Sequence, residues 1–196
     1  RQEITPQLFS EETRLEKQSD DENSSIELIY AGLVLLWPFV TMLFQRLNLW
    51  DAEKKEFVSA SAQNKGIFLL YFIATGTDEC EELSELSMMK LLCGLPLDFE
   101  SEAVSLTQEE KEICESLMTA AINRWAKLGT ISLDGFRTTF LNRLGFLEQE
   151  EEAVLIRIES VGLDILLDFL PWTISTVRLP WLEKPLKVRW REKGIF

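Results

Sequence analysis

The most constraining feature of this sequence is an uncharged, mostly apolar run of seventeen residues, from 28 to 44. A segment this apolar has to leave water, either in a protein core or in a bilayer. We expect a buried core helix, because Gly32, Pro38 and Thr41 weaken a bilayer span and no second apolar span accompanies it. Proline lacks the N–H of an i to i−4 bond, so Pro38 is expected to start a second helix over 39–47 or to kink a single one. A membrane-anchored protein with a span at 28–44 is the alternative hypothesis.

By composition the rest of the chain divides into three parts. Residues 1–25 are acidic with little apolar periodicity, which predicts a linker or a partner-ordered tail. Residues 26–150 show helical spacing, whereas 151–196 change to strand-like alternation and are expected to pack on the same domain. A chain of 196 residues can bury one core. It starts at Arg1 with no signal-peptide pattern, so we expect a fragment of a longer protein.

Helix signals recur through the body. Asp51 is a candidate N-cap, and the apolar run 67–73 that follows fits a buried strand or a buried helix. We interpret it as a helix, because the element extends beyond usual strand length and Gly76 suits a helix end. Residues 82–93 have helical intervals and end at the Gly-x-Pro of 94–96.

Two further helices are expected before the pattern changes. Thr107 and Glu110 have capping-box spacing ahead of a regular apolar stripe. Another helix follows Ser132, with its arginines, Arg137 and Arg143, directed away from the apolar face. Gly145 is expected to end it.

Beyond residue 150 the apolar residues alternate as in strands. We expect strands over 153–159, 173–179 and 186–191, with a short helical segment over 163–170 between the first two. The predicted fold class is α+β, a mainly helical bundle followed by a small antiparallel β-sheet at the C-terminus.

Charge excludes one class of partner. The net charge is −13, yet residues 178–196 carry six Lys/Arg against two Glu. Nucleic acids are bound largely by neutralising phosphates, so an acidic body with a small basic end argues against them. The basic end is expected to meet an acidic protein surface or the chain's own body.

The residues predict no enzymatic chemistry. The chain has no histidine, which excludes Ser-His, Cys-His and His-metal schemes. Cys80, Cys93 and Cys114 have no CxxC spacing and are interpreted as free thiols, with Cys93 in the core. Asp164 and Asp168 are spaced i, i+4 and could hold a hard cation, but the polar face of an amphipathic helix explains them better. A metal-dependent hydrolase therefore ranks last, and we expect no cofactor or metal.

Two Leu-Pro-Trp steps, 170–172 and 179–181, mark the C-terminal segment. Each proline presets a turn, and each tryptophan adds a large apolar surface at the corner. Trp172 and Trp181 are expected either to pack on the helices or, if exposed, to anchor a partner. The full set of candidate partner-docking residues is Trp172, Trp181, Arg178, Lys184, Lys187, Arg189, Trp190 and Arg191.

Several phrases, in order from about residue 26 to 190, resemble the tape-measure protein family of contractile injection systems, the phage-tail-like particles of bacteria. They are AGLVLLWPF (31–39), FLLYFIATG (68–76), KLLCGLP (90–96), LTQEEKE (106–112), GLDILLDFLPW (162–172), LPW (179–181) and VRW (188–190). Trp37 departs from the pattern, since a histidine is expected there. The motif residues, interpreted as structural, are Gly32, Pro38, Cys93, Gly94, Pro96, Gly162, Asp164, Pro171 and Pro180.

The resemblance implies a non-enzymatic assembly protein that helps set tube and sheath length and docks at one end of the particle. Its implied partners are inner-tube, baseplate or spike proteins. Its implied location is the cytoplasm during assembly and then the injection particle.

Overall fold

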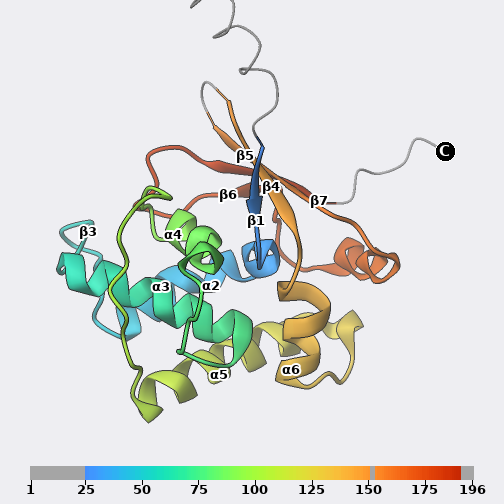
Figure 1. Ribbon diagram of the computed structural model, residues 1–196. Coiled ribbons are helices and arrows are strands. Elements are labelled where there is room, and N and C mark those ends of the chain that lie inside the picture. The colour runs from blue at the N-terminus through green and yellow to red at the C-terminus, as the bar shows by residue number, and fades with distance from the viewer. Residues whose placement is uncertain (1–24, 151–152, 191–196) are drawn as a thin grey trace, which may run out of the picture.

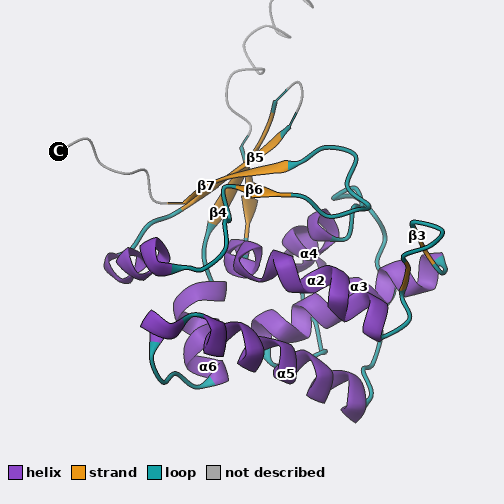
Figure 2. Ribbon diagram, turned by 180° about the vertical axis from the view of Figure 1, so that it is seen from behind, coloured by secondary structure: helices purple, strands orange, loops and turns teal. Residues whose placement is uncertain are grey.

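The computed structural model describes residues 25–150 and 153–190. The predicted tail over 1–25, apart from Ser25, and the candidate residue Arg191 lie outside the described residues. Figure 1 shows a sheet at one end of the molecule and a helical layer at the other. The same two layers appear from behind in Figure 2.

One sheet gathers strands from both ends of the chain, in the order β1-β4-β5-β7-β6. Its strands are β1 (Ile26–Leu28), β4 (Gly145–Gln149), β5 (Val154–Ile158), β7 (Leu186–Trp190) and β6 (Thr176–Val177). The predicted α+β class is confirmed. The sheet is mixed and not purely antiparallel, because β5 and β7 run parallel, with Val154 opposite Leu186 and Ile158 opposite Trp190. Parallel neighbours need a long crossover, here supplied by the 27 residues from 159 to 185.

The uncharged run 28–44 does not form one helix. Its first residue, Leu28, is the last residue of β1. The run then forms the 3₁₀ helix η1 (Ala31–Leu36) and continues into α2 (Trp37–Arg46). Pro38 lies in the first turn of α2, so it starts a second helix as one of the two alternatives predicted. Within the described part of the chain, no helix is long and apolar enough to cross a membrane. The span at 28–44 is therefore contradicted.

Most predicted helices are confirmed. Gly76, at φ 85°, caps α3 as expected, and Thr107 and Glu110 form the predicted capping box of α5. The helices beyond α2 in the described residues are α3 (Ala60–Thr75), η2 (Leu83–Leu86), α4 (Ser87–Leu92), α5 (Gln108–Arg124), η3 (Ala126–Leu128), α6 (Leu133–Phe136), the π-helical turn η4 (Arg137–Leu141) and η5 (Gly162–Phe169).

Two local predictions were wrong. Asp51 caps no helix: it lies in a small hairpin, β2 (Trp50–Asp51) with β3 (Glu56–Phe57), and its carboxylate accepts the N–H groups of Glu53 and Lys54. Ser59 is the N-cap of α3 instead, accepting from the Ala62 N–H at 3.0 Å. Gly145 begins strand β4, because the chain leaves its helix at Asn142.

The prediction that the arginines of the Ser132 helix point away from the apolar face was also wrong. Arg137 and Arg143 are both only 7% exposed. The guanidinium of Arg137 donates to the Ile73 carbonyl (3.0 Å) and to Asp134 (2.8 Å), which satisfies its buried donors. The predicted strand over 173–179 is reduced to β6, since only two of its residues pair with β7.

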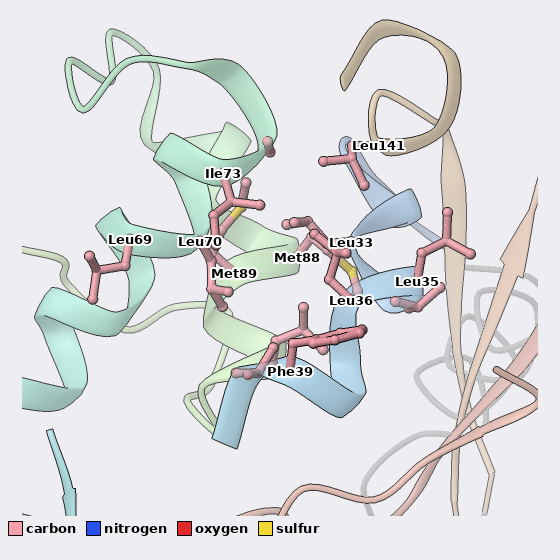
Figure 3. Close-up of a cluster of buried hydrophobic side chains, with 14 of the residues drawn as sticks. Leu33, Leu35, Leu36, Phe39, Leu69, Leu70, Ile73, Met88, Met89 and Leu141 are labelled. Atoms are coloured by element: carbon pink, nitrogen blue, oxygen red, sulfur yellow. The ribbon is translucent and has the colours of Figure 1, made fainter. Parts of the chain in front are cut away.

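The core lies between the sheet and the helices. Figure 3 shows its centre, where Leu33 and Leu36 of η1 lie near Met88 of α4. Residues from α3 and the end of η4 complete the cluster, among them Leu70, Ile73 and Leu141. The 3₁₀ helix η1 is thus buried on all sides, whereas the α-helix that follows it, α2, exposes Pro38 and Met42.

Candidate docking surface

The C-terminal segment is fastened to the helical body by its tryptophans. The indole N–H of Trp172 donates to the Leu35 carbonyl at 2.8 Å, and its ring lies edge-on to Phe39 at 5.2 Å. A second hydrogen bond runs from the body to this segment: the indole N–H of Trp37 donates to the Thr173 carbonyl at 2.8 Å. Both tryptophans are half-buried. The position at which a histidine was expected thus carries an indole that ties α2 to the C-terminal segment.

Trp181 makes the second attachment. Its indole N–H donates to the Leu92 carbonyl at 2.8 Å, and its ring stacks on Phe44 at 5.3 Å. Gly94 lies against it at φ 71°, where a Cβ would come within 3.1 Å of the Trp181 ring and carbonyl. Beside this contact, an open groove of about 450 Å³ is lined by Trp181, Pro96 and Lys184, among others. Trp172 and Trp181 therefore pack on the helices, while part of Trp181 also faces the groove.

A buried ion pair makes the third attachment. Asp164 is fully buried, and its carboxylate accepts from Arg143 Nη2 (2.8 Å), the Val161 N–H (2.8 Å) and Trp190 Nε1 (3.0 Å). Arg143 also donates from Nε to the Thr139 carbonyl at 2.8 Å. The expectation of Asp164 on a solvated polar face was therefore wrong. Among the described residues, no group of three or more His, Cys, Asp or Glu is placed to hold a metal ion.

The helical period explains this error. Residues 162–169 form the 3₁₀ helix η5, with three residues per turn, and not the α-helix that the leucine spacing suggested. Because the period is three residues, Asp164 and Leu167 lie on the same, inward side of the helix. The same period leaves Leu163 outside, at 56% exposure.

Four large apolar residues of this element are exposed as a result. They form a ridge at 49–56% exposure: Val161, Leu163, Ile165 and Phe169. The ridge is held from behind by Asp164 and by Trp125, whose indole N–H donates to the Leu166 carbonyl at 3.2 Å. The sequence-based reasoning missed these residues. A signal was present, since Val161, Leu163 and Ile165 alternate with polar or small residues and do not follow helical spacing.

The predicted basic residues are exposed: Arg178, Lys184, Lys187 and Arg189. On β7, Lys187 and Arg189 alternate with buried Leu186, Val188 and Trp190, as the sequence predicted. Lys187 pairs with Glu150 at 2.8 Å, and this hydrogen bond, aided by the nearby Arg189, lowers the pKa of Glu150. Arg157, opposite Arg189 on β5, pairs with Glu148. Part of the basic end therefore meets the chain's own acidic residues.

The remaining motif residues occupy close contacts or turns. A Cβ on Gly32 would lie 1.8 Å from the Phe140 carbonyl oxygen, so η1 can approach η4 only with glycine there. Cys93 is fully buried, which raises the pKa of its thiol. A Cβ on Gly162, by contrast, would meet no neighbouring atom within 4 Å. Exposed turns hold the three prolines Pro96, Pro171 and Pro180.

A family model described as contractile injection system tape measure protein matches residues 1–190. The chain belongs to this family. It is thus part of a contractile injection system, in a family of structural proteins. No match was found among curated proteins or among solved structures. The phrases on which the resemblance rested supply the three attachments described above, since Trp172, Trp181, Asp164 and Trp190 all lie within them.

Proposed function

We propose that this tape measure family member is a non-enzymatic structural domain that docks at one end of the tube-sheath particle and helps set its length. Membership of the family supports a role within the particle. Inner-tube, baseplate or spike proteins are the partners that such a role requires. The proposed docking surface is the η5 ridge together with the basic residues of β7 and its flanking loops.

The observation that carries this proposal is the ridge on η5. Leu163 and Ile165 are 56% and 55% exposed, and Phe169 is 52% exposed. Apolar surface of this kind favours removal from water, at about 25 cal/mol per Å². Because the buried Asp164 and Trp125 contacts hold η5 in place, the ridge needs little ordering when it binds.

The basic residues of β7 and its flanking loop favour an acidic partner. Trp190 contacts Asp164 of η5 through its indole, whereas Arg189, the preceding residue, projects from the other, exposed face of β7. Lys187 projects from the same face of β7, and Lys184 lines the groove beside Trp181. A partner surface with apolar side chains at its centre and carboxylates at its rim matches this arrangement.

A single matched pair of variants tests the surface. Leu163→Asp places a charge on the ridge, whereas Leu83→Asp places the same charge on an equally exposed leucine (57%) of η2. We expect Leu163→Asp to abolish copurification of the protein with native particles and to broaden the particle length distribution seen by electron microscopy. Leu83→Asp is expected to leave both unchanged. Normal copurification of the folded Leu163→Asp variant would refute the assignment of the ridge.

A further inference from the structure

The helical end of the molecule carries an apolar groove that the proposed docking surface does not use. It runs between α2 and α5, has a volume of about 110 Å³ and is floored by the buried Leu43 and Leu117. Met42 lines it with 55% of its surface exposed, and Ser116 and Ala120 line it from α5. Figures 1 and 2 show α5 at the end of the molecule opposite the sheet. An adaptable methionine beside an apolar groove is typical of a surface that a partner covers.

The exposed face of α5 carries opposite charges at its two ends. Glu109 and Glu112 are exposed in its first turns, and Arg124 and Lys127 are exposed at and just beyond its last turn. Their positions are symmetric: Glu112 and Arg124 each lie six residues from residue 118, and Glu109 and Lys127 each lie nine. The small residues of the groove wall lie two residues on either side of the same midpoint. This face is therefore complementary to itself when a second copy is turned end for end.

Two arginines near this face affect how a second copy could approach it. The Arg124 guanidinium lies 5.7 Å from the centre of the Phe39 ring, which places the end of α5 beside the start of α2 and makes the two helices antiparallel. Arg46, near the other end of α2, also lines the groove, and its charge repels an incoming arginine. The two negative charges of Glu109 and Glu112 at that end of the groove exceed the single positive charge of Arg46.

We propose that two copies of this chain pair through the α2–α5 groove, with their α5 helices antiparallel about residue 118. Glu112 of each copy faces Arg124 of the other, about 9 Å along the axis from the midpoint. Glu109 and Lys127, which lies in η3 just beyond α5, add a second pair of opposite charges at each end of the contact. Small residues at the crossing let the helix axes approach to about 8 Å, and Met42 of each copy enters the groove of the other. The contact uses the same patch on both copies and closes after two, and it leaves the sheet end open.

A charge-swap experiment on the full chain tests the proposal. The wild-type protein is expected to show twice the 22.6 kDa chain mass by light scattering after size exclusion, falling towards 22.6 kDa on dilution. Glu109→Lys/Glu112→Lys and Arg124→Glu/Lys127→Glu each juxtapose like charges, so each is expected to weaken self-association about 100-fold or more. An equimolar mixture of the two double variants restores opposite charges and is expected to regain the dimer mass.

Control variants separate this contact from general charge effects. Glu79→Lys/Glu81→Lys makes the same charge change at exposed positions of the loop before η2 and is expected to leave the dimer intact. Circular dichroism melting confirms that each variant is folded. A wild-type monomer at every concentration, a dimer insensitive to both reversals, or a mixture that stays monomeric overturns the proposal. Because Lys127 lies 5.5 Å from the centre of the Phe169 ring of the ridge, Leu163→Asp is also measured by light scattering, and it is expected to lose particle binding but keep the dimer.

Discussion

Replacing Asp164 by asparagine tests the ion pair that holds η5 to the body. The carboxylate has no solvent exposure and accepts three hydrogen bonds, from Arg143, the Val161 N–H and Trp190. Asparagine keeps the shape but removes the charge and replaces one acceptor oxygen with an NH₂ donor. Whichever way the amide turns, its NH₂ group faces a donor at hydrogen-bond distance.

The expected loss of stability is large. The Arg143 side chain is 8% exposed, so without Asp164 its charge stays buried without its counter-ion. Removing one partner of such a pair costs about 3–5 kcal/mol. For a chain of this length each kcal/mol moves Tm by about 2–4 °C, so we expect Tm to fall by roughly 6–20 °C.

Urea and thermal unfolding, followed by circular dichroism and tryptophan fluorescence, measure this loss. Asp168→Asn is the matched control, because Asp168 lies on the same helix but is exposed to solvent, which screens its interactions, so its cost is expected to be well below that of Asp164→Asn. Adding Arg143→Met to Asp164→Asn is expected to cost less than the sum of the single changes, since it removes the stranded charge. A cost below about 1 kcal/mol for Asp164→Asn, or equal costs for both asparagine variants, would show that the ion pair is not buried as described.

Three further predictions concern the body. Gly32→Ala is expected to cost at least about 3 kcal/mol in unfolding experiments, because its Cβ meets backbone at 1.8 Å, whereas Gly162→Ala should be nearly neutral; equal costs would contradict the close contact. Burial raises the pKa of Asp78, but its ion pair with a lysine and the N–H of Leu106 more than offset this and lower the pKa overall. Its stabilising contribution is thus present above about pH 4 and lost as pH falls further, so Asp78→Asn should flatten the acid limb of a stability–pH curve. With a thiol reagent, half-buried Cys80 should react first and the two buried cysteines only on unfolding; simultaneous reaction of all three in the folded protein would contradict their burial.

Sequence alone located the elements whose signals are local. The capping box of Thr107 and Glu110 is complete within four residues, and Gly76 stops α3 through its own backbone conformation. The alternation over 186–190 likewise reports which side of β7 is buried. Such features depend on neighbours along the chain, so they can be read before any tertiary contact is known.

Tertiary structure decided the features that depend on distant partners. β1 has three residues and no clear alternation, and it becomes a strand because it pairs with β4 across more than a hundred residues of chain. The parallel register of β5 and β7 is set in the same way by the crossover between them. Asp164 illustrates the point for the site: its type and its i+4 partner suggested a solvated face, yet Arg143 and Trp190 supply the donors that make burial favourable. Without those partners the carboxylate could not leave water, and with them η5 turns its apolar residues outward.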